Sequence, residues 1–255
     1  MNEWALITGA STGIGLELAR LFAADGYNVI LVSRNRARLE QLASELQARH
    51  GISAKVFAKD LSSLAAPEEL FDALRETPVS ILVNNAGFGW RGRFTEGEMS
   101  RSLGMMHVNM DALVRLTHLF AQPMLARRQG RILNVASTAA FQPGPLTAIY
   151  FATKAFVFSF SVALGEELAG TGVTVTTFCP GGTETEFFAR AGMGSARHRM
   201  YLMKADKVAR IGYRACMKGK PIVIAGALNK ASSSLARRMP VRFIARIVKW
   251  MNGGG

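Results

Sequence analysis

The sequence has little cysteine, and no segment of it has the marks of a secreted or membrane-spanning protein. Its two cysteines, Cys179 and Cys216, form no CxxC pair and lie near no histidine cluster of metal-ligand spacing, so we expect neither a metal site nor a disulfide. The first residues leave no room for a charged region, an apolar stretch and a cleavage site, so we expect no signal peptide. Residues 151–168 are apolar but are interrupted by Lys154 and two glutamates, so we expect no membrane span. These absences predict a cytoplasmic protein.

Acidic residues are also scarce, because 18 Asp and Glu face 31 Lys and Arg and give a formal net charge of +13. Such a charge permits nucleic acid, an anionic membrane surface or phosphorylated small molecules as partners. Much of the excess lies in residues 34–49 and 218–249, and not in a stripe of basic and aromatic residues suited to stacking bases. We therefore predict no nucleic-acid partner.

Length and composition suit one folded domain. The 255 residues are 49% hydrophobic and 19% charged, near the averages for globular proteins, and no internal repeat or linker marks a second domain. Short aliphatic runs alternate with stretches of helical spacing, which predicts repeated βαβ units. Predicted strands cover residues 5–8, 29–33, 54–58, 81–84, 131–136 and 173–178, and predicted helices cover residues 15–24, 36–49, 67–76, 99–126 and 148–169. The expected fold is a single α/β domain with a doubly wound parallel sheet and helices on both faces.

A glycine-rich turn, TGASTGIG at residues 8–15, joins the first strand to the first helix. Glycines let the backbone approach a diphosphate closely, and the helix N-terminus offers free N–H groups. The spacing is GxxxGxG and does not match GxGxxG. An ordinary strand-to-helix loop is the alternative interpretation.

The second strand ends in Ser33 and Arg34, where an acidic residue would bind the adenosine ribose 2′-hydroxyl. A hydroxyl beside a guanidinium instead suits a 2′-phosphate, which arginine grips with two hydrogen bonds. This pair favours NADP(H) over NAD(H). A solvated arginine at the start of a helix is the alternative.

Further polar residues end other strands, and Tyr150 and Lys154 stand four residues apart on one helix face. Carboxyl ends of parallel strands converge on one crevice, so these residues are expected to face one ligand. Together the motifs resemble the short-chain dehydrogenase/reductase family over nearly the whole chain. They occur in the family's order: the TGxxxGxG turn, Asp60 and Leu61, NNAG at residues 84–87, Asn109, Ser137, YxxxK, and Pro180 and Gly181 with Thr185.

The resemblance implies a Rossmann-like domain that interconverts a carbonyl and an alcohol by hydride transfer. It implies that Tyr150 is the acid/base, that Lys154 favours its phenolate and binds the nicotinamide ribose, that Ser137 holds the substrate oxygen, and that Asn109 anchors a water on the proton path. The implied cofactor contacts are Thr8, Gly9, Ser11, Thr12, Gly13, Ile14, Gly15, Ser33, Arg34, Asp60, Leu61, Asn84, Ala86, Gly87, Tyr150, Lys154, Pro180, Gly181, Thr183 and Thr185.

The substrate is expected to contact residues 88–98, 139–149 and 187–201, which are apolar with a few arginines. A hydrophobic cleft is predicted from Phe88, Trp90, Phe94, Phe141, Leu146, Phe187, Phe188 and Met193. Gly192, Gly194 and Ser195 suggest a mobile lid. A lipophilic ketone, a fatty 3-oxoacyl thioester or a steroid-like ring fits this description equally well.

Residues 229–255 form an extension beyond the predicted domain of residues 1–228. Arginines alternate with Leu, Phe, Ile and Trp over residues 232–250, a basic amphipathic pattern that Pro240 is expected to divide into two helices. Such a segment packs on the domain or a partner subunit, or contacts an anionic membrane peripherally. The resemblance implies a homodimer or homotetramer formed through the helices that carry Asn109 and Tyr150.

Three functions are consistent with the sequence. The leading one is an NADP(H)-dependent reductase of a lipophilic carbonyl. The second is a catalytically silent NADPH-binding regulator, which would bind the cofactor without turnover. The third is a membrane-associated interaction protein that acts through the basic C-terminal segment, and it would bind anionic vesicles in a salt-sensitive way.

Overall fold

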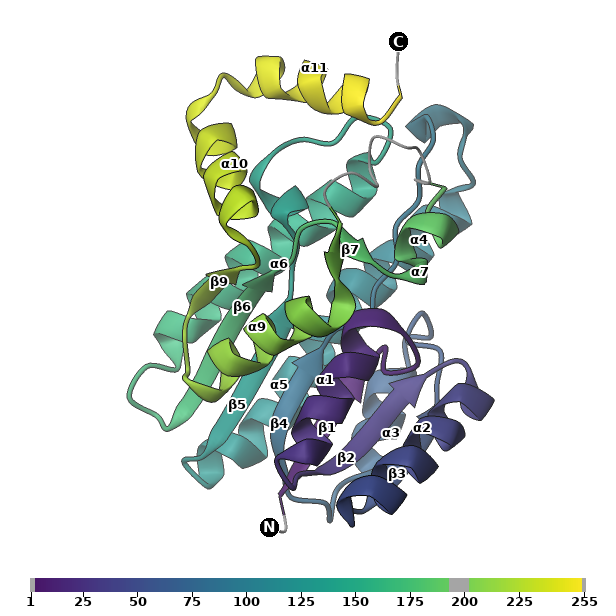
Figure 1. The fold of residues 1–255 in the computed structure, drawn as a ribbon, viewed down its shortest axis with the longest axis vertical. Helices are drawn as coiled ribbons and strands as arrows, with labels where there is room; N and C mark the ends of the chain where they lie inside the picture. Colours follow the sequence, from purple (N-terminus) through teal and green to yellow (C-terminus); the bar gives the residue numbers. More distant parts are fainter. Residues whose placement is uncertain (1–2, 193–201, 254–255) are drawn as a thin grey trace.

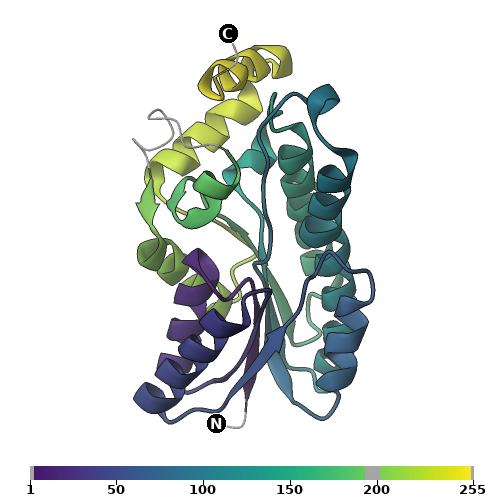
Figure 2. The ribbon, with the colours of Figure 1, turned by 90° about the vertical axis from the view of Figure 1, so that its right-hand side faces the viewer.

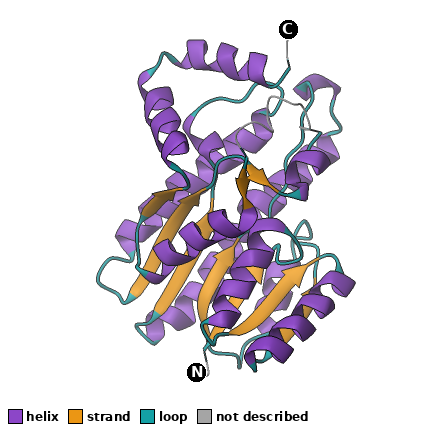
Figure 3. Ribbon diagram, in the orientation of Figure 1, coloured by secondary structure: helices purple, strands orange, loops and turns teal. Residues whose placement is uncertain are grey.

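The computed structural model describes residues 3–192 and 202–253. Its main sheet has seven parallel strands in the order β3-β2-β1-β4-β5-β6-β9 (Figures 1 and 3). The strands are β1 (Trp4–Thr8), β2 (Asn28–Ser33), β3 (Ala54–Ala58), β4 (Val79–Asn84), β5 (Gly130–Val135), β6 (Val173–Cys179) and β9 (Ile222–Ile224), and β7 (Thr183–Glu184) pairs with β8 (Met203–Lys204) in a second small sheet. The predicted fold class is confirmed.

Helices cover both faces of the main sheet (Figure 2). They are α1 (Gly13–Ala24), α2 (Arg36–His50), α3 (Ala66–Ala73), α4 (Met99–Met106), α5 (Ala112–Ala126), α6 (Ala148–Glu167), α7 (Glu186–Arg190), α9 (Ala205–Met217), α10 (Ala227–Arg238) and α11 (Val241–Met251). One face carries α1, α2 and α9, and the other carries α3, α5 and α6.

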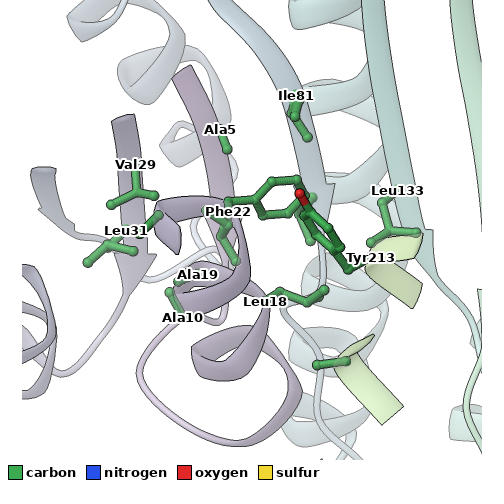
Figure 4. Close-up of a cluster of buried hydrophobic side chains, with 14 of the residues drawn as sticks. Ala5, Ala10, Leu18, Ala19, Phe22, Val29, Leu31, Ile81, Leu133 and Tyr213 are labelled. Carbon is green, nitrogen blue, oxygen red and sulfur yellow. The ribbon is translucent and has the colours of Figure 1, made fainter. Parts of the chain in front are cut away.

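The core on the α1 side is centred on Phe22, which is fully buried (Figure 4). Its ring meets the ring of Tyr213 edge-on at 4.9 Å and that of Tyr27 at 5.9 Å. Burying one phenylalanine contributes about 1.5–3 kcal/mol to folding, and the central strands add aliphatic side chains on both faces because helices cover both. This double coverage explains the nearly continuous apolar runs of the sequence.

The strand order reverses between β1 and β4, which leaves a crevice beyond the carboxyl ends of these two strands. β2 continues the sheet on one side of this switch point, and β5 and β6 continue it on the other. Residues that follow β1, β2, β4, β5 and β6 therefore share one edge of the sheet, and every motif singled out in the sequence lies on or beside that edge.

Two features differ from the sequence expectations, and a third agrees with them. β9 and the β7–β8 pair were not predicted, because strands of two or three residues carry no detectable alternation. The predicted helix over residues 99–126 is divided into α4 and α5 by a π-helical turn, η2 (His107–Asp111). The break expected at Pro240 does occur, since α10 ends at Arg238 and α11 begins at Val241.

Helix α6 has the length and the mean hydropathy, 1.5, of a helix able to cross a membrane. The expectation that no segment has such a composition was therefore wrong. The reason is that Lys154 is one charge in a long apolar segment and the two glutamates stand at its end, so the mean hydropathy of α6 stays high. In the structure α6 packs against β6 and carries Lys154 into the crevice.

Candidate active site

The Thr8 hydroxyl joins the turn after β1 to the loop after β4. Thr8 Oγ1 donates a hydrogen bond to the Val83 carbonyl at 3.1 Å and accepts bonds from the backbone N–H groups of Asn85 and Ala86, each at 3.0 Å. The Asn85 side-chain amide in turn donates to the Thr8 carbonyl at 3.0 Å. These bonds hold the two strand ends at the switch point in one rigid unit.

The glycine-rich turn leaves no room for side chains at two of its positions. A Cβ on Gly15 would lie 2.3 Å from the Gly9 carbonyl oxygen, and a Cβ on Gly13 would lie 2.7 Å from the Thr185 methyl carbon. α1 begins at Gly13, and the hydroxyl of its N-cap residue Thr12 makes no capping bond. The N–H groups of the first turn are therefore available to an anion, which is the arrangement that binds a diphosphate.

A groove of about 440 Å³ runs beside this turn, between α1, α2 and α7. Ser11 of the turn lines it, whereas Ile14 packs on the core beneath α1. The Arg38 guanidinium contacts both carboxylate oxygens of Glu186, at 2.9 and 3.1 Å, and so joins α2 to α7 at the groove. This pair links residues 148 positions apart in the sequence, and no sequence motif indicates it.

Ser33 and Arg34 lie at the end of β2, on the side expected to receive the adenosine. Ser33 Oγ is buried, and no hydrogen-bond partner for it lies among the described residues. Arg34 is exposed, and within the described chain no carboxylate pairs with its guanidinium within 4 Å. An unsatisfied hydroxyl beside an unpaired guanidinium fits a phosphate group.

Asp60 and Leu61 follow β3 beside Arg34. Burial acts to raise the pKa of the Asp60 carboxyl, but hydrogen bonds from Ser62 and the charge of Arg34 outweigh it, so the pKa lies below its usual value. Asp60 Oδ1 accepts bonds from the Ser62 N–H at 2.9 Å and the Ser62 hydroxyl at 2.8 Å. Leu61 is buried and forms part of the apolar floor here.

Ser137, Tyr150 and Lys154 come together at the carboxyl ends of β5 and β6. Lys154 is 5% exposed, and its Nζ donates a hydrogen bond to the Val135 carbonyl at 2.8 Å and lies 5.9 Å from the centre of the Tyr150 ring. Burial raises the pKa of the Tyr150 phenol to about 12, although a hydrogen bond with Ser137 acts to lower it. Burial lowers the pKa of the Lys154 ammonium to about 8.

Asn109 sits in the π-helical turn η2, where it bridges two elements of the site. Its Oδ1 accepts a bond from the Phe88 N–H at 3.1 Å, and its Nδ2 donates to the Phe88 carbonyl at 3.1 Å and to Thr153 Oγ1 at 3.0 Å. Thr153 Oγ1 donates to the Tyr150 carbonyl at 2.7 Å. Gly87 packs against this amide, since a Cβ there would lie 3.0 Å from Asn109 Oδ1.

Thr153 was missed by sequence reasoning, because a threonine between the tyrosine and lysine of the YxxxK motif carries no signal of its own. Asn84, expected to contact the cofactor, is buried at the end of β4. Its Nδ2 donates to Thr117 Oγ1 and to Asn134 Oδ1, each at 2.9 Å, within a buried polar chain that continues to Ser161. The amide nitrogen of Asn84 is therefore used within the protein, whereas its Oδ1 is buried with no hydrogen-bond partner among the described residues, and the expected cofactor contact stays a prediction.

The loop after β6 lies over the glycine-rich turn. The Pro180 carbonyl accepts a bond from the Thr138 N–H at 2.9 Å, and Thr183 Oγ1 donates to the Gly181 carbonyl at 3.0 Å. Thr185 caps α7 by accepting from the Phe187 N–H at 3.3 Å, and its methyl group faces Gly13. This loop is therefore positioned to cover whatever the turn binds.

Aromatic side chains gather around Tyr150 on the substrate side. The Phe187 ring lies 5.3 Å from the Tyr150 ring, and a Cβ on Gly89 would lie 2.9 Å from the Phe187 ring. Phe151, whose ring is 6.1 Å from that of Tyr150, packs on the apolar side of α11. Met193 of the predicted cleft, and Gly194 and Ser195 of the predicted lid, lie outside the described residues.

Among the described residues, no group of three His, Cys, Asp or Glu side chains is placed to hold a metal ion. Cys179 and Cys216 are both buried and unpaired with each other, and burial raises the pKa of each thiol to about 12. Thiols with such a pKa stay protonated at neutral pH and are poor nucleophiles. The groups left as candidates for chemistry are the Tyr150 phenol, the Lys154 ammonium and the Ser137 hydroxyl.

Comparisons with known proteins identify the family. Residues 3–194 match the family model described as short chain dehydrogenase. The chain is 36% identical over 189 residues to 17-beta-hydroxysteroid dehydrogenase type 3 of Mus musculus, with 71% of this chain and 60% of that protein covered. It is 41% identical over 183 residues to a very-long-chain 3-oxoacyl-CoA reductase of Phaeosphaeria nodorum, with 68% and 53% covered.

Among solved structures, the short-chain dehydrogenase from Sphingobium yanoikuyae in complex with NADPH is similar to this chain with a TM-score of 0.83 and 30% identity, covering 93% of this chain and 96% of that one. The chain spans about half to three-fifths of the length of the two curated relatives. The family match covers most of the chain and includes every strand up to β7. The chain therefore belongs to the short-chain dehydrogenase family.

Proposed function

We propose that this protein is an NADP(H)-dependent reductase of a lipophilic carbonyl, with Tyr150 as the proton donor. The observation that carries the proposal is the grouping of a neutral phenol, a buried ammonium and a serine hydroxyl at the carboxyl edge of the sheet.

The cofactor proposal rests on the fit of the residues present. The glycine-rich turn and the start of α1 would hold the diphosphate, and Ser33 and Arg34 would hold the 2′-phosphate. Asp60, Leu61, Ala86, Gly87 and the loop from Pro180 to Thr185 would line the remainder. The bound nicotinamide would supply the hydride. The NADPH complex of the Sphingobium yanoikuyae enzyme supports this choice without deciding between NADP(H) and NAD(H).

Proton transfer follows from the two shifted pKa values. With a pKa of about 12, Tyr150 is protonated at neutral pH and able to donate to an alkoxide oxygen held by Ser137. With a pKa of about 8, Lys154 is mostly charged at pH 7, so its ammonium stabilises the phenolate that remains. The Val135 carbonyl fixes the position of that ammonium. We propose that Asn109 continues the proton path from Lys154 through a water.

The substrate proposal is a carbonyl with a large apolar group. Its support is the aromatic surface around Tyr150, together with relatives named for 17-beta-hydroxysteroids and very-long-chain 3-oxoacyl-CoA. A 3-oxoacyl thioester and a steroid-like ketone both satisfy these constraints. The silent-regulator alternative is not supported, because the phenol, ammonium and hydroxyl of a working site are all present.

The proposed organisation is a catalytic domain of residues 1–228 with residues 229–255 as an extension that packs on it. α10 and α11 contribute Ala236, Ile244 and Val248 to an apolar cluster with Phe151, next to Tyr150. We also propose that the protein resides in the cytoplasm and forms a homodimer or homotetramer.

The first experiment is a titration of the purified protein with NADPH and NADH by nucleotide fluorescence. Oxidation of the tighter-binding cofactor is then followed with medium-chain ketones, 3-oxoacyl thioesters and steroids. Tighter binding of NADPH with turnover of one lipophilic class is the expected result. Binding without turnover on any carbonyl would favour the regulator, and absence of binding would reject the proposed function.

A further inference from the structure

Helices α10 and α11 stand beyond the carboxyl edge of the main sheet (Figures 1 and 2). One side of α11 is fixed to the body of the protein, because Ile244 and Val248 are 8% and 4% exposed and pack with Phe151. Asn252, which follows the helix, is 6% exposed and donates to the Pro145 carbonyl at 2.8 Å. The rotation of α11 about its axis is therefore set, and so is the side that faces outward.

The outward side of these helices exposes large apolar side chains. Phe243 and Trp250, seven residues apart and hence on one side of α11, are 51% and 59% exposed. Val241 of α11 and Leu235 of α10 are 68% and 60% exposed. Single exposed apolar residues are common, but four on one end of a molecule mark an interaction surface.

Basic residues accompany this apolar surface and acidic ones are absent. Residues 207–255 contain eleven Lys and Arg and no Asp or Glu, out of a net charge of +13 for the whole chain. Arg242, Arg246 and Lys249 follow the spacing i, i+4, i+7 and form a stripe beside Phe243 and Trp250. No carboxylate of the described chain lies within 4 Å of Arg242 or Arg246.

We propose that this surface, formed by Leu235, Val241, Phe243 and Trp250 with Arg242, Arg246 and Lys249, docks on an anionic lipid bilayer. The aromatic and aliphatic side chains would enter the interfacial layer while the basic stripe contacts lipid phosphates. Charge complementarity favours lipid over a second copy of the chain, whose surface would bring the same positive charge. A nucleic acid would pair with the arginines but leave Val241 and Leu235 in water.

Docking on lipid does not depend on the proposed function. Only the route by which a substrate would reach the site depends on it. Docked in this way, α11 lies between the bilayer and Phe151, the neighbour of Tyr150. A lipophilic carbonyl would then reach the site from the membrane.

The test is co-sedimentation of the full-length chain with vesicles of phosphatidylcholine, with or without about 30 mol% phosphatidylglycerol. Binding is expected only to the anionic vesicles and should weaken in high salt. Phe243→Ser/Trp250→Ser and Arg242→Glu/Arg246→Glu should each reduce binding at least about tenfold. Circular dichroism and NADPH titration of each variant check that the fold and the cofactor site persist. Loss of NADPH binding, which would count against the proposed function, is thereby distinguished from loss of vesicle binding.

The matched control is Lys218→Glu/Lys220→Glu, which makes the same change in net charge. Both lysines are exposed and precede β9, at the opposite edge of the sheet from α10 and α11. This control should bind within about twofold of the unchanged protein, because docking requires the charge at one end. An equal loss in the control, equal binding to both vesicle types, or unchanged binding by either α11 variant would overturn the proposal. A shift of Phe243→Ser to a monomer, with vesicle binding retained, would also overturn the proposal. So would binding of the protein to duplex DNA if the protein does not sediment with the vesicles.

Discussion

Arg91 Nε donates a hydrogen bond of 2.6 Å to the Asn252 carbonyl oxygen, and this bond joins the loop after β4 to the residue that follows α11. The Asn252 side chain donates to the Pro145 carbonyl at 2.8 Å and to Thr147 Oγ1 at 3.2 Å. Asn252 therefore fastens the C-terminal helix to both loops that flank Tyr150. If the substrate cleft lies beneath α11, this residue determines how firmly the cleft is covered.

We expect Asn252→Ala to raise the KM for a long lipophilic carbonyl by roughly 5- to 50-fold while kcat changes less than about threefold. The Pro145 carbonyl and Thr147 Oγ1 would lose the donor that ties the end of α11 to their loop. Steady-state kinetics on short and long ketones measure this. Asn28→Ala, which removes an acceptor for the Ser53 N–H at the far edge of the sheet, should lower thermal stability without this KM effect. A similar KM change in both variants would contradict a specific role for Asn252.

Tyr150→Phe should reduce turnover by about 10² to 10⁴ while NADPH affinity stays within about threefold, since only the proton donor is lost. Stopped-flow reduction and fluorescence titration report the two quantities. Tyr27→Phe removes a phenol hydroxyl from the core beside Phe22 and should leave turnover intact. Retained turnover in Tyr150→Phe would refute the assignment of the acid.

Arg34→Asp should weaken NADPH binding by roughly 10- to 100-fold and NADH binding much less, because charge-assisted bonds to a phosphate contribute about 1.5–3 kcal/mol. Arg36→Asp is the matched control, since Arg36 already pairs with Glu40 at 3.4 Å. Competitive titrations with both cofactors give the ratio. Equal losses of NADPH and NADH affinity would exclude a 2′-phosphate site at Arg34.

The rate of carbonyl reduction should fall as pH rises through about 8, the pKa to which burial lowers Lys154. Below that pH the ammonium is charged and stabilises the phenolate, and above it the neutral amine does not. Tyr150 does not account for this limb, because burial holds its pKa near 12. In Lys154→Arg the guanidinium stays charged throughout, so any remaining activity should lack the limb between about pH 7 and 9. An unchanged limb in this variant would assign the titration to another group.

Phe156→Ser should shift the protein toward a smaller species in light scattering coupled to size-exclusion chromatography. Phe156 on α6 is 41% exposed, and its ring stacks on that of Phe160 at 6.0 Å, so the outer side of this helix is apolar. Phe94→Ser, at a residue 53% exposed outside α6, should leave the size unchanged. Identical elution of both variants and the unchanged protein would argue against an oligomer formed through α6.

The sequence predicted the central sheet well because strands covered on both faces are apolar throughout, and this pattern is local. The order of the motifs likewise predicted which strand ends meet. Contacts between residues far apart in the sequence could not be predicted from such local patterns. The Arg38–Glu186 pair spans 148 positions and the Arg91–Asn252 bond spans 161, and no local pattern announces either one. Whether the C-terminal segment packs on its own domain depends on such contacts.

The family resemblance assigned Asn84 to the cofactor. The structure adds what the sequence could not show, because the Asn84 amide nitrogen donates to Thr117 and Asn134 while its Oδ1 is buried with no hydrogen-bond partner among the described residues. Thr153 bridges Asn109 to the Tyr150 carbonyl without any motif position of its own.

The π-helical turn at His107–Asp111 determines what the loss of one residue at this point would do to the protein. A π-helical turn contains one more residue than a turn of the α-helix on either side of it, and α4 and α5 still present their apolar sides to the core. Loss of a single codon within it would therefore restore an unbroken helix from α4 to α5 and leave the apolar packing in place. The same loss would withdraw Asn109 from Phe88 and Thr153. A scan of in-frame deletions should find here a protein that folds and yet no longer links its helix to the loop beside Tyr150.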